Sequence, residues 1–453
     1  MKTTPLLLAA GKGTRIKSAQ PKVLHELFGK PLVQYALDAA RQSSGTRPIL
    51  IVGHDAEKIQ AELGDQCDYV HQEQLLGTGH AVQQAEAVLR NQTDQILVTY
   101  GDMPLVRAET LQKLIRTQES HPGPLTMLSL RVDNPRGFGR VIRNARGEVE
   151  AIVEEVDATP EQLSVRELNA GMYCVDEDWL WDALGKIQVS SKGEYYLTDL
   201  VAIAVREGLQ VAVVQIDDPE ELIGINTRVH LADAHRVLQQ RINRRMMEAG
   251  VTILDPLSVW IDPDVRIGRD TVILPQTHLR GETEIGENCQ LGPQTLIDGS
   301  RVGRGCQIQF SVVEDAVLED GVDVGPFSHL RKGAHLADGV HLGNFGEVKN
   351  SYLGPGTKMG HFSYLGDATL GKGVNVGAGT ITCNYDGKQK HRTVVEDGVF
   401  LGSDTMLVAP VELGKGSRTG AGSVVTKDVK PGSLVVGVPA REISSLRKKS
   451  TGE

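Results

Sequence analysis

Aliphatic residues recur at every sixth position over long stretches of the C-terminal half of the chain. One such series consists of Leu318, Val324, Leu330, Leu336, Leu342 and Val348, and similar series run from Ile267 to Ile297 and from Leu401 to Val425. This period matches neither an α-helix, which repeats at about 3.6 residues, nor a free strand, which repeats at about 2. It fits coils of three short strands that each point one aliphatic side chain inward and stack to bury a continuous column. The pattern therefore predicts a parallel β-helix.

The first half of the chain alternates short apolar runs with stretches of helical period. Residues 6–10, 48–52, 95–100 and 125–130 are predicted to be buried strands, and residues 32–41 and 78–89 are predicted to be helices. Alternation of this kind favours a mostly parallel sheet covered by helices, an α/β fold. Such sheets bind their ligands at the carboxyl ends of the strands.

A stretch without glycine or proline separates the two patterns. It covers residues 227–249, is rich in Arg, Gln and Leu, and places its apolar residues near one helical stripe. Gly250 follows, where a helix would end. We therefore predict an α/β domain over residues 1–226, a linker helix over residues 227–250 and a β-helix domain over residues 251–453.

Composition narrows the possible classes of protein. A chain of 453 residues is too long for one ordinary core. Its formal charge of −10 argues against nucleic acid as a partner, although local lysines and arginines can still hold small anions. Five cysteines without a Cys-x-x-Cys pair are typical of reduced, cytoplasmic thiols. No apolar run is long enough for a membrane span or a signal peptide, so we expect a cytoplasmic protein.

A glycine-rich segment follows the first predicted strand. It reads Gly11-Lys12-Gly13-Thr14-Arg15, and Lys22 comes shortly after it. Glycines at a strand end let backbone amides approach a phosphate, and Arg15 and Lys22 can neutralise a triphosphate. A plain turn is the structural alternative, and the segment is neither a Walker loop nor a dinucleotide-binding fingerprint.

Asp102 lies just after the predicted strand 95–100, at the carboxyl edge of the sheet. A turn or capping role is common for such an aspartate. Next to a phosphate-binding loop, however, it favours Mg²⁺, which takes one or two protein oxygens together with substrate phosphates.

These motifs resemble those of the sugar-nucleotide pyrophosphorylases. Residues 8–15 with Pro21-Lys22 are similar to the family signature, in which methionine is usual at the position of Ile16. Further matches are Gln72 and residues 76–80, 137–140, 153–155, 169–171, 194–196 and 224–226. Together with the six-residue repeat, they resemble the bifunctional N-acetylglucosamine-1-phosphate uridylyltransferase/glucosamine-1-phosphate N-acetyltransferase family over essentially the whole chain. The resemblance implies a Rossmann-like nucleotidyltransferase domain, a linker helix and a left-handed β-helix of hexapeptide repeats.

The resemblance implies a nucleotide site in the first domain. The residues expected to bind UTP or the UDP-sugar are Leu8, Ala9, Ala10, Gly11, Lys22, Gln72, Gly77, Thr78, Tyr100, Gly101, Asp102, Gly139, Glu154, Asn169 and Asn226. Tyr196 is a further candidate for the sugar. Arg15 and Lys22 are expected on the UTP phosphates, and Asp102 and Asn226 are expected to ligate Mg²⁺. Taken singly, either asparagine would be an ordinary loop cap.

The reaction that the resemblance implies fits these residue types. The phosphate of the sugar is already an anionic nucleophile, so its attack on the α-phosphorus of UTP needs no general base. It needs positioning and charge neutralisation.

The six-residue pattern breaks at residues 383–387, and a polar excursion over residues 388–392 follows. An insertion into a regular solenoid is more often functional than random. Acetyl transfer from a thioester to an amine requires a base for the amine proton, and His361 is the candidate because its ordinary pKa lies near neutrality. Glu347 either orients the imidazole of His361 or is a solvated carboxylate at the edge of a coil.

The resemblance assigns further residues of the second domain. Arg331, Lys349, Tyr364, Asn375 and Lys390 are expected to bind glucosamine-1-phosphate, and Ala378, Asn384, Tyr385, Ser403 and Ala421 to bind acetyl-coenzyme A. The family's acetyl site assembles between chains, so a homotrimer through the β-helix is implied. Gly437 stands where some members carry an arginine near the coenzyme phosphate, and Arg441 is expected to supply that charge.

The leading hypothesis is a two-site enzyme. Glucosamine-1-phosphate is acetylated in the C-terminal domain and then uridylylated with Mg²⁺ in the N-terminal domain, which yields UDP-N-acetylglucosamine for the bacterial cell wall. One alternative is a pyrophosphorylase whose β-helix serves only regulation or trimerisation, and such a helix would have no use for His361 or Tyr364. A non-catalytic scaffold is the other alternative, and it would leave Asp102 and Lys22 without a role.

Overall fold

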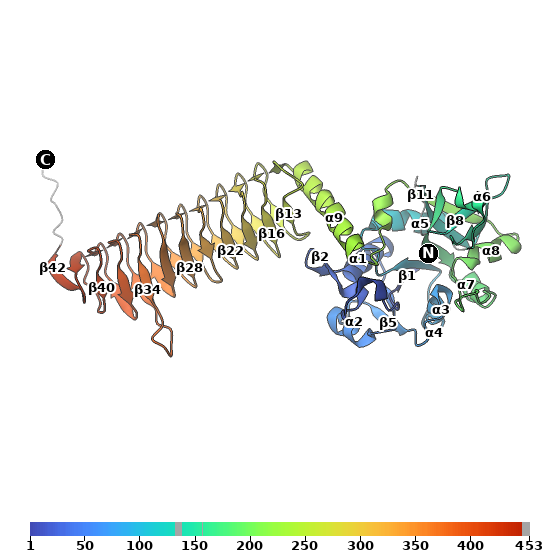
Figure 1. Cartoon of the computed structure of the whole chain (residues 1–453), viewed down its shortest axis with the longest axis horizontal. Coiled ribbons are helices and arrows are strands. Elements are labelled where there is room, and N and C mark those ends of the chain that lie inside the picture. Colours follow the sequence, from blue (N-terminus) through green and yellow to red (C-terminus); the bar gives the residue numbers. More distant parts are fainter. Residues whose placement is uncertain (132–137, 156, 446–453) are drawn as a thin grey trace. The chain divides into compact units, whose positions relative to one another are not determined.

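The computed structural model describes residues 1–131, 138–155 and 157–445. The chain divides into two compact units, Met1–Val237 and Leu238–Glu453. Figure 1 labels the elements of both units. The boundary falls inside helix α9 (Arg228–Glu248), which occupies the position of the predicted linker helix. No helix in the described residues is long and apolar enough to cross a membrane.

The first unit is built on one mixed sheet. Its strands are β1 (Thr3–Leu8), β4 (Ile49–Val52), β5 (Asp68–His71), β6 (Gln95–Tyr100), β7 (Leu125–Arg131), β8 (Arg140–Arg143), β9 (Val149–Val153), β10 (Glu167–Asp176) and β11 (Val211–Ile216). The main path runs β11-β7-β10-β6-β1-β4-β5, and β8 and β9 extend it from β10. Strands β5, β4, β1 and β6 are parallel neighbours, whereas β10 pairs antiparallel with both β6 and β7. A small hairpin, β2 (Glu26–Leu27) and β3 (Lys30–Pro31), lies outside this sheet.

Helices cover the sheet on both sides. They are α1 (Leu32–Ser44), α2 (Ala56–Leu63), α3 (Thr78–Gln83), α4 (Glu86–Leu89), α5 (Ala108–Ser120), α6 (Pro160–Leu163), α7 (Glu177–Leu184) and α8 (Asp199–Arg206). Neighbouring residues of β1 point to opposite faces: Leu7 joins the cluster that includes α1 and α5, and Leu6 joins the cluster that includes α3, α7 and α8. Burial on both faces explains why the strands appear in the sequence as continuous apolar runs.

The predicted helix over residues 78–89 is interrupted. Backbone hydrogen bonds tighten around Gln84 and Ala85, where the Ala85 N–H donates to the Val82 carbonyl oxygen at 3.0 Å. The segment therefore forms α3 and α4 as two short helices.

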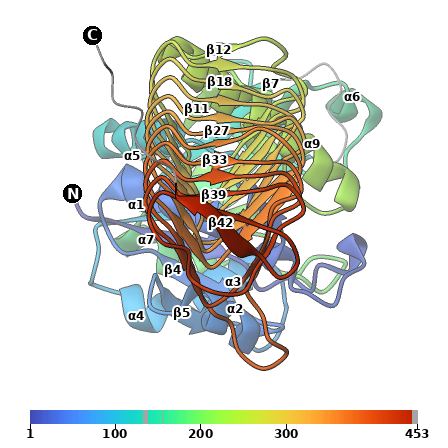
Figure 2. The same cartoon turned by 90° about the vertical axis from the view of Figure 1, so that its left-hand side faces the viewer.

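The second unit is a β-helix whose coils form three sheets (Figure 2). The first face contains β12 (Thr252–Ile253), β15 (Val272–Ile273), β18 (Gln290–Leu291), β21 (Gln307–Ile308), β24 (Asp323–Val324), β27 (His341–Leu342), β30 (Lys358–Met359), β33 (Asn375–Val376), β36 (Phe400–Leu401), β39 (Arg418–Thr419), β41 (Ser433–Val436) and β42 (Arg441–Ser445). The second face contains β13 (Trp260–Ile261), β16 (His278–Arg280), β19 (Leu296–Asp298), β22 (Val312–Glu314), β25 (His329–Leu330), β28 (Gly346–Lys349), β31 (Ser363–Gly366), β34 (Ile381–Cys383), β37 (Met406–Val408) and β40 (Val424–Val425). The third face contains β14 (Arg266–Ile267), β17 (Glu284–Ile285), β20 (Arg301–Val302), β23 (Val317–Leu318), β26 (His335–Leu336), β29 (Tyr352–Leu353), β32 (Ala368–Leu370), β35 (Thr393–Val395) and β38 (Val411–Leu413).

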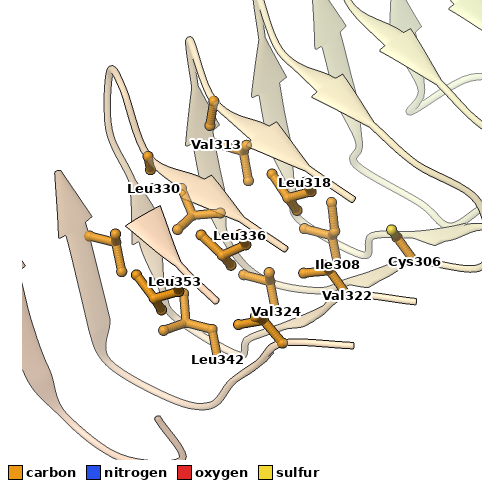
Figure 3. Packing of buried hydrophobic residues seen from close by; sticks show 14 of the residues in the cluster. Cys306, Ile308, Val313, Leu318, Val322, Val324, Leu330, Leu336, Leu342 and Leu353 are labelled. Atoms are coloured by element: carbon orange, nitrogen blue, oxygen red, sulfur yellow. The ribbon is translucent and has the colours of Figure 1, made fainter. Parts of the chain in front are cut away.

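The strand register confirms the meaning of the six-residue period. Leu318 pairs with Leu336 on the third face, Val324 pairs with Leu342 on the first face, and Leu330 pairs with Val348 on the second face. Successive members of the series therefore lie on different faces, and members separated by one coil stack directly (Figure 3). These side chains are almost completely buried. All strand pairs of this unit are parallel except the last, β41 with β42. The fold is a left-handed parallel β-helix of hexapeptide repeats.

Candidate active sites

The carboxyl ends of β1 and β6 lie side by side in the first unit, with Leu8 paired to Tyr100. The segments that leave these two strands therefore start from the same edge of the sheet. The chain after β1 turns at Gly13, which has a φ of 60°, and a Cβ atom there would lie 2.7 Å from the Cβ of Lys22. Glycine is required at this position because both the backbone angle and the contact exclude a side chain.

A cavity of about 1020 Å³ opens at this edge and collects most of the predicted nucleotide and sugar residues. They are Leu8, Ala9, Ala10, Gly11, Arg15, Lys22, Gln72, Gly77, Thr78, Tyr100, Asp102, Gly139, Glu154, Asn169 and Tyr196. Gly101 and Asn226 are not among the lining residues. Gly101 donates its N–H to the Leu8 carbonyl oxygen at 3.0 Å, next to the cavity. Gly137, part of a matched motif, lies outside the described residues.

Two cations and two oxygen ligands meet at one end of the cavity. Lys22 Nζ donates to the Asp102 carboxylate and, at 3.1 Å, to Asn226 Oδ1. Arg15 Nη2 donates to the same Asn226 oxygen at 2.9 Å. Because one ammonium group reaches both oxygens, Asp102 and Asn226 face a common point. A carboxylate and an amide oxygen that converge in this way fit a hard divalent cation such as Mg²⁺.

The other end of the cavity is shaped by β10. The Asn169 N–H donates to the Gly139 carbonyl oxygen at 2.8 Å, and the Asn169 side-chain amide donates to the Tyr173 hydroxyl at 2.8 Å. Asn169 Oδ1 accepts the Gly171 N–H at 3.0 Å. Asn169 is therefore held by backbone and side-chain bonds at a defined place on the wall.

Glu154 is one of the carboxylates in the wall of the cavity. Burial raises its pKa, and the nearby carboxylates of Asp157 and Asp199 raise it further, while Lys192 opposes the shift. Burial raises the pKa because the charged form of a carboxyl group loses hydration inside a protein.

Several lining residues are not among the predicted site residues, although some of them belong to matched motifs. Among them are Phe138, Glu155, Gly171, Lys192 and Thr198. Gly171 belongs to a matched motif and carries its own signal: a Cβ atom there would lie 3.1 Å from the Tyr100 hydroxyl, and its φ is 77°. Lys192 does not belong to any matched motif, so nothing in the sequence indicated that it would line the cavity.

The insertion in the β-helix forms a loop between β34 and β35, which protrudes from the coils in Figure 1. Tyr385 and Lys390 bridge across it. Asp386 holds the turn, since its carboxylate accepts the Gln389 N–H at 2.7 Å and the His391 ring at 2.7 Å. The Gln389 N–H, the His391 ring and the Lys388 N–H hold the pKa of Asp386 below its ordinary value.

Asn384 ties this loop to the coils. Its side-chain amide donates to Asp367 Oδ2 at 2.6 Å, and Asp367 Oδ1 accepts from Asn350 of the coil before at 2.6 Å. The predicted break in the repeat is therefore an ordered loop, which hydrogen bonds of Asn384 and Asp386 hold in place.

Part of the predicted acetyl-acceptor site lies on the second face. Arg331 Nη1 donates to Glu347 Oε1 at 2.8 Å, and Glu347 is in register with Tyr364 on the next coil. Lys349 ends the same strand as Glu347. In the described part of the chain Glu347 forms its ion pair with Arg331 rather than with His361. A role for Glu347 in orienting His361 stays a prediction.

The remaining predicted acetyl-site residues occupy other parts of the prism. His361, Ala378, Ser403 and Ala421 follow strands of the first face, at the corner that leads to the second face. Asn375 lies on the first face itself, in register with Lys358 and Phe400. A single chain therefore does not bring Asn375 to the group around Arg331.

Arg441 lies in the final strand, β42. It is exposed, and its Nη1 donates to the Ala440 carbonyl oxygen at 3.0 Å. Arg441 comes four residues after Gly437. Its role near the coenzyme phosphate stays a prediction.

Comparison with known proteins agrees with the two-unit architecture. The MobA-like NTP transferase domain family matches residues 5–155, the bacterial transferase hexapeptide family matches residues 264–299, and the hexapeptide repeat of succinyl-transferase matches residues 392–427. The bifunctional protein GlmU of Heliobacterium modesticaldum is 49% identical over 96% of this chain and 95% of its own length. The bifunctional protein GlmU of a Geobacillus species is 44% identical over 98% of this chain and 97% of its own. That of Geobacter metallireducens is 46% identical over 95% of each chain.

Proposed function

The chain belongs to the family of bifunctional GlmU proteins, and from this membership we infer that it catalyses two transfers in the synthesis of UDP-N-acetylglucosamine. One moves the acetyl group of acetyl-coenzyme A to glucosamine-1-phosphate. The other moves the uridylyl group of UTP to N-acetylglucosamine-1-phosphate and releases pyrophosphate, with Mg²⁺ as cofactor. The observation that carries this conclusion is similarity at 49% identity along 96% of the chain, which covers both units.

We propose that the cavity of the first unit is the uridylyltransferase site. A phosphate oxygen of the sugar phosphate attacks the α-phosphorus of UTP, a new P–O bond forms, and the bond to the leaving pyrophosphate breaks. Arg15 and Lys22 neutralise the phosphates, and Gly11 leaves room for them because a Cβ atom there would meet nothing within 4 Å. Asp102 and Asn226 would hold Mg²⁺, which would supply further positive charge to the triphosphate.

The sugar lies at the other end of this cavity in the proposal. Gly139, Glu154, Asn169 and Tyr196 bind N-acetylglucosamine-1-phosphate there. Support comes from the fixed orientation of Asn169 and from Gly139, where a Cβ atom would lie 2.9 Å from Ile152 and 3.4 Å from Glu154 Oε1. A side chain at position 139 would therefore crowd this end of the cavity.

We propose that the β-helix carries the acetyltransferase site. His361 accepts a proton from the sugar amine as the amine nitrogen attacks the thioester carbonyl. The C–N bond forms, the C–S bond breaks, and coenzyme A leaves as the thiolate. Arg331, Lys349, Tyr364, Asn375 and Lys390 bind the acceptor. Ala378, Asn384, Tyr385, Ser403, Ala421 and Arg441 bind the coenzyme.

We further propose that the protein is a homotrimer through the β-helix and acts in the cytoplasm. Three phenylalanines, Phe310, Phe327 and Phe345, stack along one corner of the prism with ring centroids 5.6 and 5.4 Å apart. Phe327 and Phe345 are 56% and 59% exposed, and this corner continues towards His361. An exposed aromatic ladder of this kind is typical of a protein interface.

The exchange Phe327→Asp tests the trimer. We expect it to convert the trimer to smaller species, as measured by size-exclusion chromatography with light scattering, because a charge would be buried at the interface. Acetyl transfer should fall about tenfold or more with it, while uridylyl transfer stays unchanged. Val317→Asp, on the third face, is the matched control and should leave the assembly intact. A trimeric Phe327→Asp variant with full acetyl transfer would refute the proposed interface.

A product assay tests the function as a whole. The protein is supplied with glucosamine-1-phosphate, acetyl-coenzyme A, UTP and Mg²⁺, and each component is then omitted in turn. We expect UDP-N-acetylglucosamine only from the complete mixture. N-Acetylglucosamine-1-phosphate should accumulate without UTP, and no acetylated sugar should form without acetyl-coenzyme A. Formation of the final product without Mg²⁺ would contradict the proposed metal dependence.

A further inference from the structure

The amide of Gln72 is held at the wall of the nucleotide cavity. Gln72 directly follows β5, is only 4% exposed, and its N–H donates to the Val52 carbonyl oxygen at 2.8 Å. Its side-chain Nε2 lies 3.1 Å from the Gly77 carbonyl oxygen and 3.1 Å from His80 Nδ1. Among the described residues Gln72 Oε1 has no hydrogen-bond partner, and the side chain lines the cavity.

The Gly77 contact determines which way this amide points. A carbonyl oxygen can only accept a hydrogen bond, so the Gln72 atom next to Gly77 must be the NH₂ group. The second N–H of that group reaches His80 Nδ1, which must then be an unprotonated acceptor. With both N–H bonds made to the protein, only the carbonyl oxygen of Gln72 is left for a ligand.

Gln84 contacts the opposite side of the same ring. Its Nε2 lies 3.2 Å from His80 Nε2 and 3.1 Å from the His80 carbonyl oxygen. A neutral imidazole accepts at only one ring nitrogen, so Gln72 and Gln84 cannot both donate to it. Each amide has a second bond to a carbonyl oxygen, but Gln72 is buried, whereas Gln84 is partly exposed and can turn its amide towards water. Nδ1 is therefore the acceptor, and Nε2 carries the proton.

The position of the His80 ring is set by a separate loop. His80 lies in the first turn of α3, where the Gly79 N–H donates to the Tyr195 carbonyl oxygen at 2.9 Å. The rings of His80 and Tyr195 are stacked with centroids 6.5 Å apart. Gly77 approaches the same tyrosine so closely that a Cβ atom would lie 2.6 Å from its carbonyl oxygen. The contacts with Tyr195 therefore fix the position of His80, whose Nδ1 faces Gln72.

We propose that His80 is a positioning residue that sets base specificity through Gln72. By keeping the Gln72 carbonyl oxygen towards the cavity, His80 selects a pyrimidine whose N3 carries a hydrogen. Uracil and thymine have this N–H donor, whereas N3 of cytosine is an acceptor that would face the oxygen and be repelled. The inference rests on the proposed uridylyltransferase site and adds to it a residue that selects the base without touching it.

The test compares nucleotides in the His80→Leu variant. Without an acceptor at position 80 the Gln72 amide keeps only its bond to the Gly77 carbonyl oxygen, so its preference for turning the oxygen towards the cavity weakens and the rotated amide can donate to cytosine. We expect the ratio of kcat/KM for UTP to kcat/KM for CTP to fall about tenfold, the effect of one hydrogen bond. The ratio of UTP to dTTP should not change, because both bases carry the N3 hydrogen. Pyrophosphate release with N-acetylglucosamine-1-phosphate is the readout.

Two further variants separate this role from a merely structural one. His80→Asn places an oxygen acceptor near the position of Nδ1 and should keep the UTP preference of the unaltered protein. Gln84→Ala removes the contact to the other ring nitrogen and is the matched control, with no expected change in the ratio. An unchanged UTP-to-CTP ratio in His80→Leu, or an equal loss in His80→Asn, would overturn the inference.

The test also distinguishes this inference from the function on which it rests. If the unaltered protein releases no pyrophosphate from UTP, the proposed uridylyltransferase site is wrong. If it does and only the ratio fails to move, the role of His80 is wrong and the site stands. Pyrophosphate release from UTP that each variant retains shows that its first unit is folded, because this site lies in the same unit as position 80.

Discussion

Replacing Asp102 by alanine is expected to lower kcat/KM for uridylyl transfer by roughly a hundredfold or more, a usual loss when a group that stabilises charge in the transition state is removed. Asp102 supplies the only carboxylate at the point where Lys22, Arg15 and Asn226 meet among the described residues. Without it the proposed Mg²⁺ site would have a single protein ligand, Asn226, and Lys22 would lose its charged partner. Pyrophosphate release at several Mg²⁺ concentrations measures the effect, and higher Mg²⁺ should restore only part of the rate.

The control for this variant is Asp68→Ala. Asp68 lies in the same sheet, on β5, and forms an exposed ion pair with Arg47 at 2.9 Å. Exposed pairs contribute little to stability, so this variant should keep both activities. Acetyl transfer by the Asp102→Ala protein should also be unchanged, because that site belongs to the other unit. If Asp102→Ala retained full Mg²⁺-dependent pyrophosphate release, the metal assignment would be wrong.

His361→Ala is expected to reduce acetyl transfer by roughly 10²- to 10⁴-fold, the usual contribution of a general base. The amine of the sugar must lose a proton as the new C–N bond forms, and His361 lies at the corner between the first and second faces, next to the predicted coenzyme residues Ala378 and Ser403 of the following coils. Uridylyl transfer from added N-acetylglucosamine-1-phosphate should be unaffected. Free coenzyme A, detected with a thiol reagent, gives the rate.

A second histidine of the β-helix provides the comparison. His335 lies on the third face and is hydrogen-bonded to Glu319 at 2.7 Å, with its ring against Tyr352. His335→Ala should keep acetyl transfer, since this face carries none of the proposed site residues. The size of both variants in solution is measured as well. Undiminished acetyl transfer in a trimeric His361→Ala protein would rule out His361 as the base.

The β-helix was the most predictable part of the molecule. Each inward-pointing side chain of a coil is surrounded by the same kind of apolar neighbours. The fold therefore needs an aliphatic residue at every sixth position, and the sequence shows this period. Leu318, Leu336 and Leu353 stack on one face as that reasoning requires. The break before the loop over residues 384–392 was visible for the same reason.

The first unit was predicted less completely. The apolar runs located β4, β6 and β7, but β1 begins three residues earlier than predicted, at Thr3. Strand β10 and its antiparallel pairing with β6 and β7 were not foreseen. Strand order depends on pairing between segments far apart in the chain, which local pattern does not encode. Asn169 on β10 could therefore be assigned only through a resemblance.

Pattern and residue type alone determined that the protein has an α/β half with a phosphate-binding segment at Gly11 to Arg15 and a β-helical half interrupted near residue 384. These features depend on residues that are close together in the sequence, so the local sequence is enough to predict them. The tertiary structure decided which groups meet. It joined Asn226 to Lys22 and Arg15 across more than 200 positions, paired Glu347 with Arg331, and turned the Gln72 carbonyl oxygen towards the cavity. Hydrogen bonds and ion pairs of this kind depend on distances between segments that only folding brings together.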